Sequence, residues 1–122
     1  MKLKHSEIAT YRQTQLIKQG GLCALCKQHI LDDAVLDHDH SSGLVRSVLH
    51  RGCNSLLGKI ENNMKRNRVD VTRLQSMLQS LIPYITHPHT DILHPTHKTA
   101  EDRKEIALKK RRLKQQLKRK LS

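Results

Sequence analysis

Two pairs of metal-ligating side chains lie in the first half of the sequence. Cys23 and Cys26 form a CxxC pair, and His50 and Cys53 form an HxxC pair. Three thiolates and one imidazole are the ligand set of a closed, tetrahedral structural zinc site. A redox CxxC is the alternative, but its usual βαβ setting is missing here. We therefore predict that these four residues bind a structural zinc ion, with a β-hairpin between the pairs returning the chain to its starting end.

A second set of ligands, of a harder kind, lies between and just after these pairs. Residues 36–40 read LDHDH, and Asn54 directly follows the last zinc ligand. Oxygen ligands such as Asp37 and Asn54 suit magnesium or manganese. A neutral imidazole beside such an ion can act as a general base on water, and the ion can stabilise the charge that develops on a phosphodiester. Together with a basic surface, these are the parts of a phosphodiester nuclease.

Each of these residues also has a purely structural interpretation. Asp37 could cap a turn, His38 could lie on the surface, and Asn54 could be the N-cap of the following helix. Their occurrence together, in order and inside a zinc frame, favours catalysis. Asp37 and His38 are neighbours and would point to opposite faces of a regular strand. Both can serve one site only if the strand ends, twists or bulges there.

Composition narrows the function classes. The 122 residues carry a net charge of +12, which predicts a polyanionic partner, most simply nucleic acid. Two tyrosines and no Phe or Trp argue against a platform on which single-stranded bases stack. The small aliphatic core needs a staple such as zinc. The odd count of three cysteines argues against a disulfide framework. We see no membrane span and no signal peptide, so we expect a cytoplasmic protein.

The expected fold is mainly α with a small β-hairpin, built as a zinc-stapled core followed by helices. A first helix over 5–19 would have Ser6 as N-cap and end at Gly20-Gly21. The hairpin would pair 34–38 with 44–49, with turn residues at 39–43. A helix would start at Asn54. Another would span 69–82, with Asp70 or Thr72 as its cap and Pro83 as its end.

These elements divide the chain into five segments. They are an N-terminal helix (1–21), the zinc-bound core (22–63), a helical region that could dimerise (64–83), a linker rich in His and Pro (84–98) and a basic tail (99–122). The tail has ten lysines and arginines against three acidic residues, a net charge of +7. This tail is either a solvated run of charges or, as we prefer, a helix that becomes more stable when it binds phosphate groups.

The strings GGLCALC and VLDHDHSSGLVRSVLHRGCNSLLGKIENN resemble the recombination endonuclease VII family of phage proteins, part of the ββα-metal (HNH, His-Me finger) nucleases. The resemblance covers roughly residues 18–82. It implies that Asp37 and Asn54 bind the catalytic magnesium or manganese and that His38 is the general base. It also puts the four zinc ligands at the family's zinc positions and Arg46 at the family's arginine position, where it would contact phosphate. His40 is an auxiliary candidate.

The resemblance implies a magnesium-dependent DNA endonuclease that acts on branched or duplex DNA. It also implies a homodimer located in the cytoplasm of a host cell. Holliday-junction-like substrates are expected. This sequence departs from the family in two places. The third zinc ligand is His50, where the best-known members have Cys. Junction-resolving members also use an acidic residue from the helical region that follows, and 69–82 contains only Asp70. The alternatives are a non-catalytic zinc module that binds nucleic acid and an RNA-binding accessory protein. The DNA contacts expected on charge are Arg46, Lys59, Lys65, Arg66, Lys109, Lys110, Arg111 and Arg112.

Overall fold

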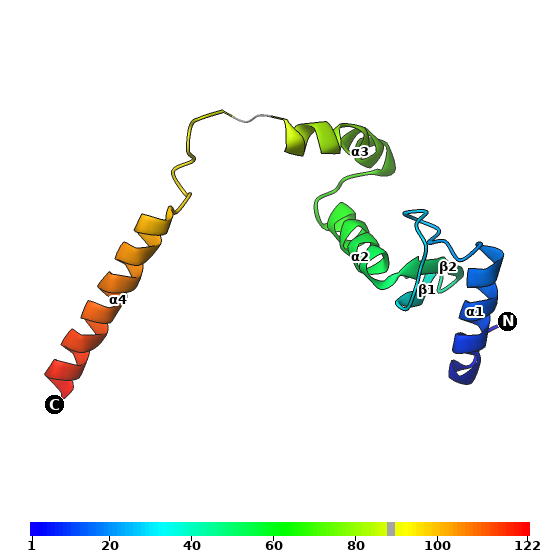
Figure 1. Ribbon diagram of the computed structural model, residues 1–122, viewed down its shortest axis with the longest axis horizontal. Coiled ribbons are helices and arrows are strands. Elements are labelled where there is room, and N and C mark those ends of the chain that lie inside the picture. Colours follow the sequence, from blue (N-terminus) through cyan, green and yellow to red (C-terminus); the bar gives the residue numbers. More distant parts are fainter. Residues whose placement is uncertain (88–89) are drawn as a thin grey trace. The chain divides into compact units, whose positions relative to one another are not determined.

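The computed structural model describes residues 1–87 and 90–122 and contains two compact units, Met1–Tyr84 and Ile85–Ser122. The first unit holds a two-stranded antiparallel sheet with a helix on each side (Figure 1). Among the described residues, no helix has the length and apolar character needed to cross a membrane. The mainly helical architecture with one hairpin confirms the predicted fold class.

The N-terminal helix starts with a single 3-10 turn, η1 (His5–Glu7), and continues as α1 (Ile8–Lys18). Ser6 lies inside η1, so the prediction that it caps the helix was wrong. The Glu7 carboxylate accepts a hydrogen bond from the Lys4 backbone N–H at 2.9 Å instead. Gly20 and Gly21 have positive φ angles of 66° and 77°, which end the helix and turn the chain towards the first cysteine pair.

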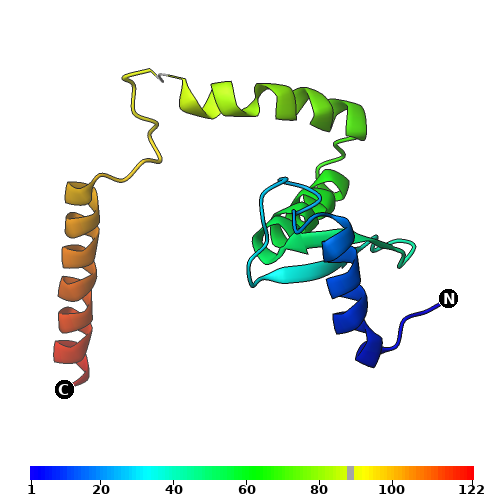
Figure 2. The ribbon, with the colours of Figure 1, turned by 45° about the vertical axis from the view of Figure 1, so that its right-hand side comes forward.

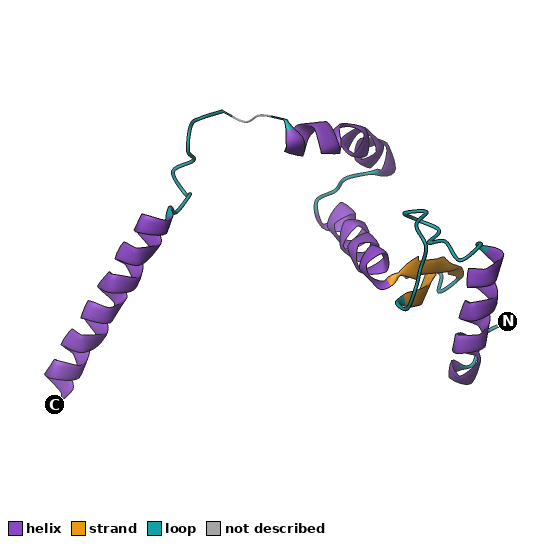
Figure 3. Cartoon of the chain, viewed as in Figure 1, coloured by secondary structure: helices purple, strands orange, loops and turns teal. Residues whose placement is uncertain are grey.

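The hairpin pairs β1 (Ala34–His38) with β2 (Val45–His50), and it lies between α1 and α2 (Figures 2 and 3). Leu36 is opposite Val48, but His38 is opposite Val45. One residue of β1 therefore faces two residues of β2, which is a β-bulge. The irregularity predicted at Asp37 and His38 is present.

The third piece of the core is α2 (Arg51–Arg66), which follows β2 without a loop. His50 is its N-cap residue, so the helix begins three residues before Asn54. The prediction that this helix starts at Asn54 was wrong, and the alternative interpretation of Asn54 as its N-cap does not hold, because Asn54 already lies in the first turn. The helix continues through Gly58, and the backbone N–H of Asn67 closes its end on the Asn63 carbonyl at 2.9 Å.

The next helix is α3 (Val71–Thr86), most of which belongs to the first unit. Of the two predicted caps, Asp70 and Thr72, Asp70 is the one observed: its carboxylate accepts a hydrogen bond from the Arg73 backbone N–H at 2.8 Å. The prediction that Pro83 ends the helix was wrong, because α3 continues to Thr86 with Pro83 inside it. A proline removes one donor from the helical ladder, and in this exposed last turn water can satisfy the carbonyl left without it. The predicted linker from residue 84 thus starts within the helix.

The core is small. Among the described residues, the buried hydrophobic side chains are Cys23, Ile30, Val48 and Leu49. Gln19 ties α1 to this core, since its amide group accepts a hydrogen bond from the Val48 N–H and donates one to the Val48 carbonyl, both at 2.9 Å. Its side chain thus acts like one residue of an extra strand beside β2.

The second unit contains α4 (Ala100–Leu121). Its N-terminus has a capping box: the Thr99 hydroxyl accepts from the Asp102 N–H at 3.1 Å, and the Asp102 carboxylate accepts from the Thr99 N–H at 2.9 Å. Acidic residues in the first turn and basic residues in the last turn match the helix dipole. The basic tail therefore forms one continuous helix.

Candidate metal centre and active site

The four predicted zinc ligands converge. One ligand atom from each of Cys23, Cys26, His50 and Cys53 lies within 4.8 Å of all the others. His50 Nδ1 is 3.3 Å from Cys26 Sγ and 3.9 Å from Cys53 Sγ. Ligand atoms of a tetrahedral zinc site, each 2.0–2.3 Å from the ion, must lie about this far apart. The donor set and its spacing therefore fit a structural zinc ion.

Backbone turns bring these ligands together. Cys23 accepts a hydrogen bond at its carbonyl from the Lys27 N–H at 3.0 Å, which closes a tight knuckle around the CxxC pair. Lys27 adopts a positive φ of 65°, a conformation that a non-glycine residue rarely takes. From the other side, the His50 ring bonds through Nε2 to the His29 carbonyl at 2.8 Å, so that Nδ1 faces the sulfur atoms. Such a second-shell bond fixes the ring of a metal-binding histidine.

Local electrostatics prepare one thiol for ligation. Burial raises the pKa of the Cys23 thiol, but hydrogen bonds from the backbone N–H groups of Cys26, His50 and Leu25 outweigh it and lower the pKa to about 6. Burial, followed by the neighbouring Cys26 and Cys23 thiols, raises the pKa of Cys53 to about 11. Because the thiolate is the form that binds metal, Cys23 is ready to ligate near neutral pH, whereas Cys53 needs the ion's own charge to ionise.

A second polar cluster forms at the bulge. Asp37 is buried, with 5% of its surface exposed. Arg46 of β2 donates to both Asp37 oxygens, from Nε at 2.7 Å and from Nη2 at 3.2 Å. The same guanidinium donates to both oxygens of Glu61 on α2, at 3.1 and 3.0 Å. Hydrogen bonding to Arg46 lowers the pKa of Glu61. One arginine thus joins two strands and a helix through two carboxylates.

The sequence patterns did not identify Glu61, because a further acidic residue was expected only in 69–82. It lies seven residues after Asn54 in α2, close to two full turns, so the two positions share one face of the helix. That spacing was the signal that could have identified it.

The two histidines of LDHDH lie beside this cluster. The rings of His38 and His40 stack, with centroids 4.8 Å apart and planes 15° from parallel, and both residues are exposed. Asp39 between them forms the turn: its carboxylate accepts the Ser41 and Ser42 N–H groups at 2.7 and 3.0 Å. These bonds lower the pKa of Asp39. A cleft of about 80 Å³ opens here, and its lining includes His40, Glu61 and Lys65.

Asp37 and Asn54 are the oxygen donors predicted to bind a hard cation. An ionised carboxylate can accept about four hydrogen bonds. Arg46 uses one direction on each Asp37 oxygen, so both oxygens keep capacity for a cation. Asn54 is half-buried in the first turn of α2, directly after zinc ligand Cys53. The donor chemistry of Asp37 and Asn54 therefore fits magnesium or manganese.

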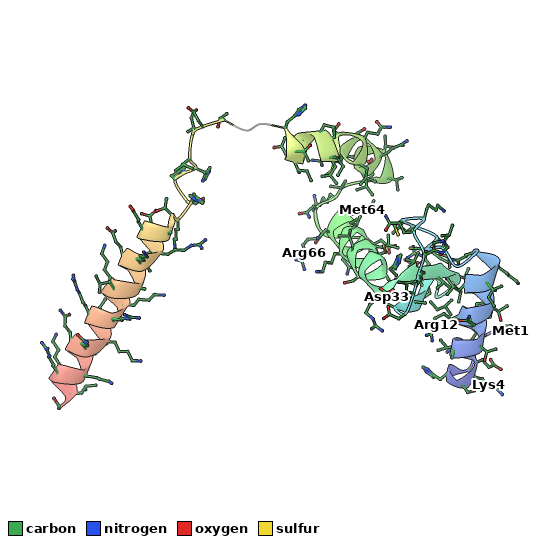
Figure 4. The ribbon with its side chains drawn as sticks, in the orientation of Figure 1. Met1, Lys4, Arg12, Asp33, Met64 and Arg66 are labelled. Carbon is green, nitrogen blue, oxygen red and sulfur yellow. The ribbon has the colours of Figure 1, made fainter. Side chains whose placement is uncertain are left out.

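The residues predicted to contact DNA lie in different settings. Arg46 is engaged by two carboxylates, and Lys65 lines the cleft beside His40. Lys59 lines an apolar groove between α2 and α3, and Arg66 is exposed in the last turn of α2 (Figure 4). The tail residues are exposed on α4, in the second unit. These four are Lys109, Lys110, Arg111 and Arg112.

A β-hairpin followed directly by a helix, with a Cys3His cluster where the strands meet that helix, defines a ββα core of the kind stapled by zinc. Residues 2–86 match the Recombination endonuclease VII family, and the chain belongs to that family. Membership implies a nuclease that hydrolyses phosphodiester bonds and has DNA as its substrate. No match to a curated protein was found.

Proposed function

We propose that this protein is a magnesium-dependent endonuclease that acts on branched DNA. The observation that carries the proposal is the end of β1, opposite the extra residue of β2, where a buried carboxylate is followed by an exposed imidazole. Asp37 is 5% exposed, whereas its neighbour His38 is open to solvent. Together with family membership, this arrangement supports a site in which one residue holds a cation and the next one reaches water.

Asp37 and Asn54 are the residues that would hold magnesium or manganese. When bound, such an ion stabilises the charge that develops on the scissile phosphate and on the leaving oxygen. The zinc ligands would keep Asn54 in place, because Cys53 directly precedes Asn54 and His50 directly precedes α2. Zinc has a structural role here, since four protein ligands leave no open position for water.

His38 is the proposed general base. Its neutral ring takes a proton from a water molecule, whose oxygen then forms a bond to phosphorus while the bond to the 3′ oxygen breaks. The leaving 3′ oxygen takes up a proton from solvent, so that the products carry a 5′ phosphate and a 3′ hydroxyl group. The His40 ring, stacked on His38 at 4.8 Å, limits the orientations that the His38 ring can adopt.

Basic residues on α2 and α4 are proposed to hold the DNA backbone. Contacts to phosphate position a protein on DNA without reading sequence. This suits an enzyme that selects its substrate by shape. The net charge of +12 supports this part of the proposal.

Two copies are proposed to act together, because one site cuts one strand. The supporting observation is an uncovered apolar surface on α2 and α3: Leu56 is 61% exposed, Met77 51% and Leu78 53%. Leu56 and Met77 line the same groove. A second copy of the chain would cover it and form a symmetric pair.

A cleavage assay tests the proposal. Supercoiled plasmid and a four-way junction are incubated with the protein in magnesium, without added divalent ion, and in EDTA. We expect magnesium-dependent cutting, faster on the junction. His38→Ala should lower the cleavage rate at least about a hundredfold, the contribution of a general base, and leave DNA affinity unchanged. His5→Ala, an exposed histidine in η1, is the matched control.

Two results would contradict the proposal. Cutting by His38→Ala at the parent rate would exclude this residue as the base. Tight DNA binding with no metal-dependent cutting would indicate a non-catalytic zinc module instead.

A further inference from the structure

Arg46 is held between two carboxylates, one on β1 and one on α2. Its guanidinium makes four hydrogen bonds to carboxylate oxygens, two to Asp37 and two to Glu61. Such bidentate pairs fix an arginine in one plane. The side chains of Arg46 and Glu61 are 34% and 35% exposed to solvent, whereas the side chain of Asp37 is 6% exposed. The outer end of this trio therefore faces solvent, and the inner end is the carboxylate proposed to hold the cation.

The charges of the trio bear directly on that carboxylate. With Asp37 and Arg46 alone, the arginine neutralises the aspartate, and a divalent cation would meet no net negative charge. Glu61 restores a net charge of −1 and shares the guanidinium with Asp37. Coulomb attraction at a few ångströms makes one unit of charge worth about tenfold or more in the affinity for a divalent ion.

We infer that Glu61 is a positioning residue that holds Arg46 on the hairpin and offsets its charge, so that Asp37 can accept a divalent cation. This inference rests on the proposed function. Glu61 acts through Arg46 and does not itself bind the ion. Removing its charge should therefore matter only while Arg46 is present.

Manganese binding to the full-length, zinc-loaded chain without DNA tests the inference. Free Mn²⁺ is measured by electron paramagnetic resonance, and Asp37→Asn defines binding elsewhere. Glu61→Gln should weaken the Asp37-dependent affinity about tenfold, and Arg46→Gln should strengthen it. In the double variant, the affinity should stay within about threefold of that of Arg46→Gln alone, because the Glu61 charge acts on Asp37 through Arg46. Glu105→Gln, the same charge change on α4, should have no effect.

Each contrary result is informative. Unchanged affinity in Glu61→Gln, or an Arg46→Gln variant that binds no more tightly than the parent, overturns the inference and leaves the nuclease proposal standing. An equal loss from Glu61→Gln in the Arg46→Gln background also overturns it, since Glu61 would then be a ligand. No Asp37-dependent binding in any variant overturns both the inference and the proposed cation site. Zinc content and circular dichroism show whether each variant is folded.

Discussion

Removal of one zinc ligand is expected to unfold the first unit. Cys26→Ser is the cleanest perturbation, because Cys26 is exposed and the change removes a ligand with little loss of packing. The four buried hydrophobic side chains contribute at most about 3 kcal/mol each. A core of four side chains is too small to keep a domain of this length folded without a further contribution, such as a bound metal ion.

Zinc supplies that contribution, since a structural site of this type adds about 10–16 kcal/mol of binding free energy at pH 7. A small domain is stable by only about 5–15 kcal/mol in total. Even a partial loss of zinc affinity should therefore abolish the folded state of Met1–Tyr84 at ordinary zinc concentrations.

The assay combines zinc content with amide NMR spectra. The parent should bind one zinc ion and show dispersed signals from the hairpin, and Cys26→Ser should lose both. Gln28→Ser is the matched control, an exposed polar residue in the same region with all four ligands kept. If Cys26→Ser lost zinc but kept the dispersed spectrum and the thermal midpoint of the parent, the reasoning would be refuted.

Two further predictions concern α4. Replacing Lys109, Lys110, Arg111 and Arg112 by Gln should reduce the slope of log affinity for DNA against log salt by about 3 to 4, since each phosphate contact contributes about 0.9; an unchanged slope in a binding titration would exclude these contacts. Hydrogen bonds from the Thr99 N–H and hydroxyl group lower the pKa of Asp102. The ionised Asp102 carboxylate therefore stabilises the first turn of α4. This stabilisation is complete above the pKa of an aspartate in the unfolded chain, about 3.9, and is lost as the pH falls through the lower pKa of Asp102 in the folded chain. The NMR signals of the first turn of α4 should show this fraying, and Asp102→Asn should show no such pH dependence.

The zinc site and the hairpin were predictable because their signals are local. Ligand spacing alone identifies the Cys3His set, and the turn residues at 39–43 separate two short strands. The need for Asp37 and His38 to serve one site also indicated an irregularity in the strand pairing, and the structure has one between Leu36 and His38. Such features depend on residues close together in the sequence, where spacing and chemistry set the geometry.

The errors came from tertiary context. Asn54 has the chemistry of an N-cap, but the zinc ligand His50 fixes the end of β2 and α2 starts immediately after it. A proline usually ends a helix, but the exposed last turn of α3 tolerates Pro83. The pairing of Arg46 with Glu61 joins residues 15 positions apart on a strand and a helix. No local pattern encodes that contact.

Anomalous X-ray scattering from crystals grown with zinc and soaked in manganese tests the central claim most directly. The account predicts two separate peaks. The zinc peak should lie among Cys23, Cys26, His50 and Cys53, and the manganese peak should lie against the Asp37 carboxylate and the Asn54 amide oxygen. Manganese bound elsewhere, with Asp37 and Asn54 contacting no ion, would contradict the proposed nuclease site.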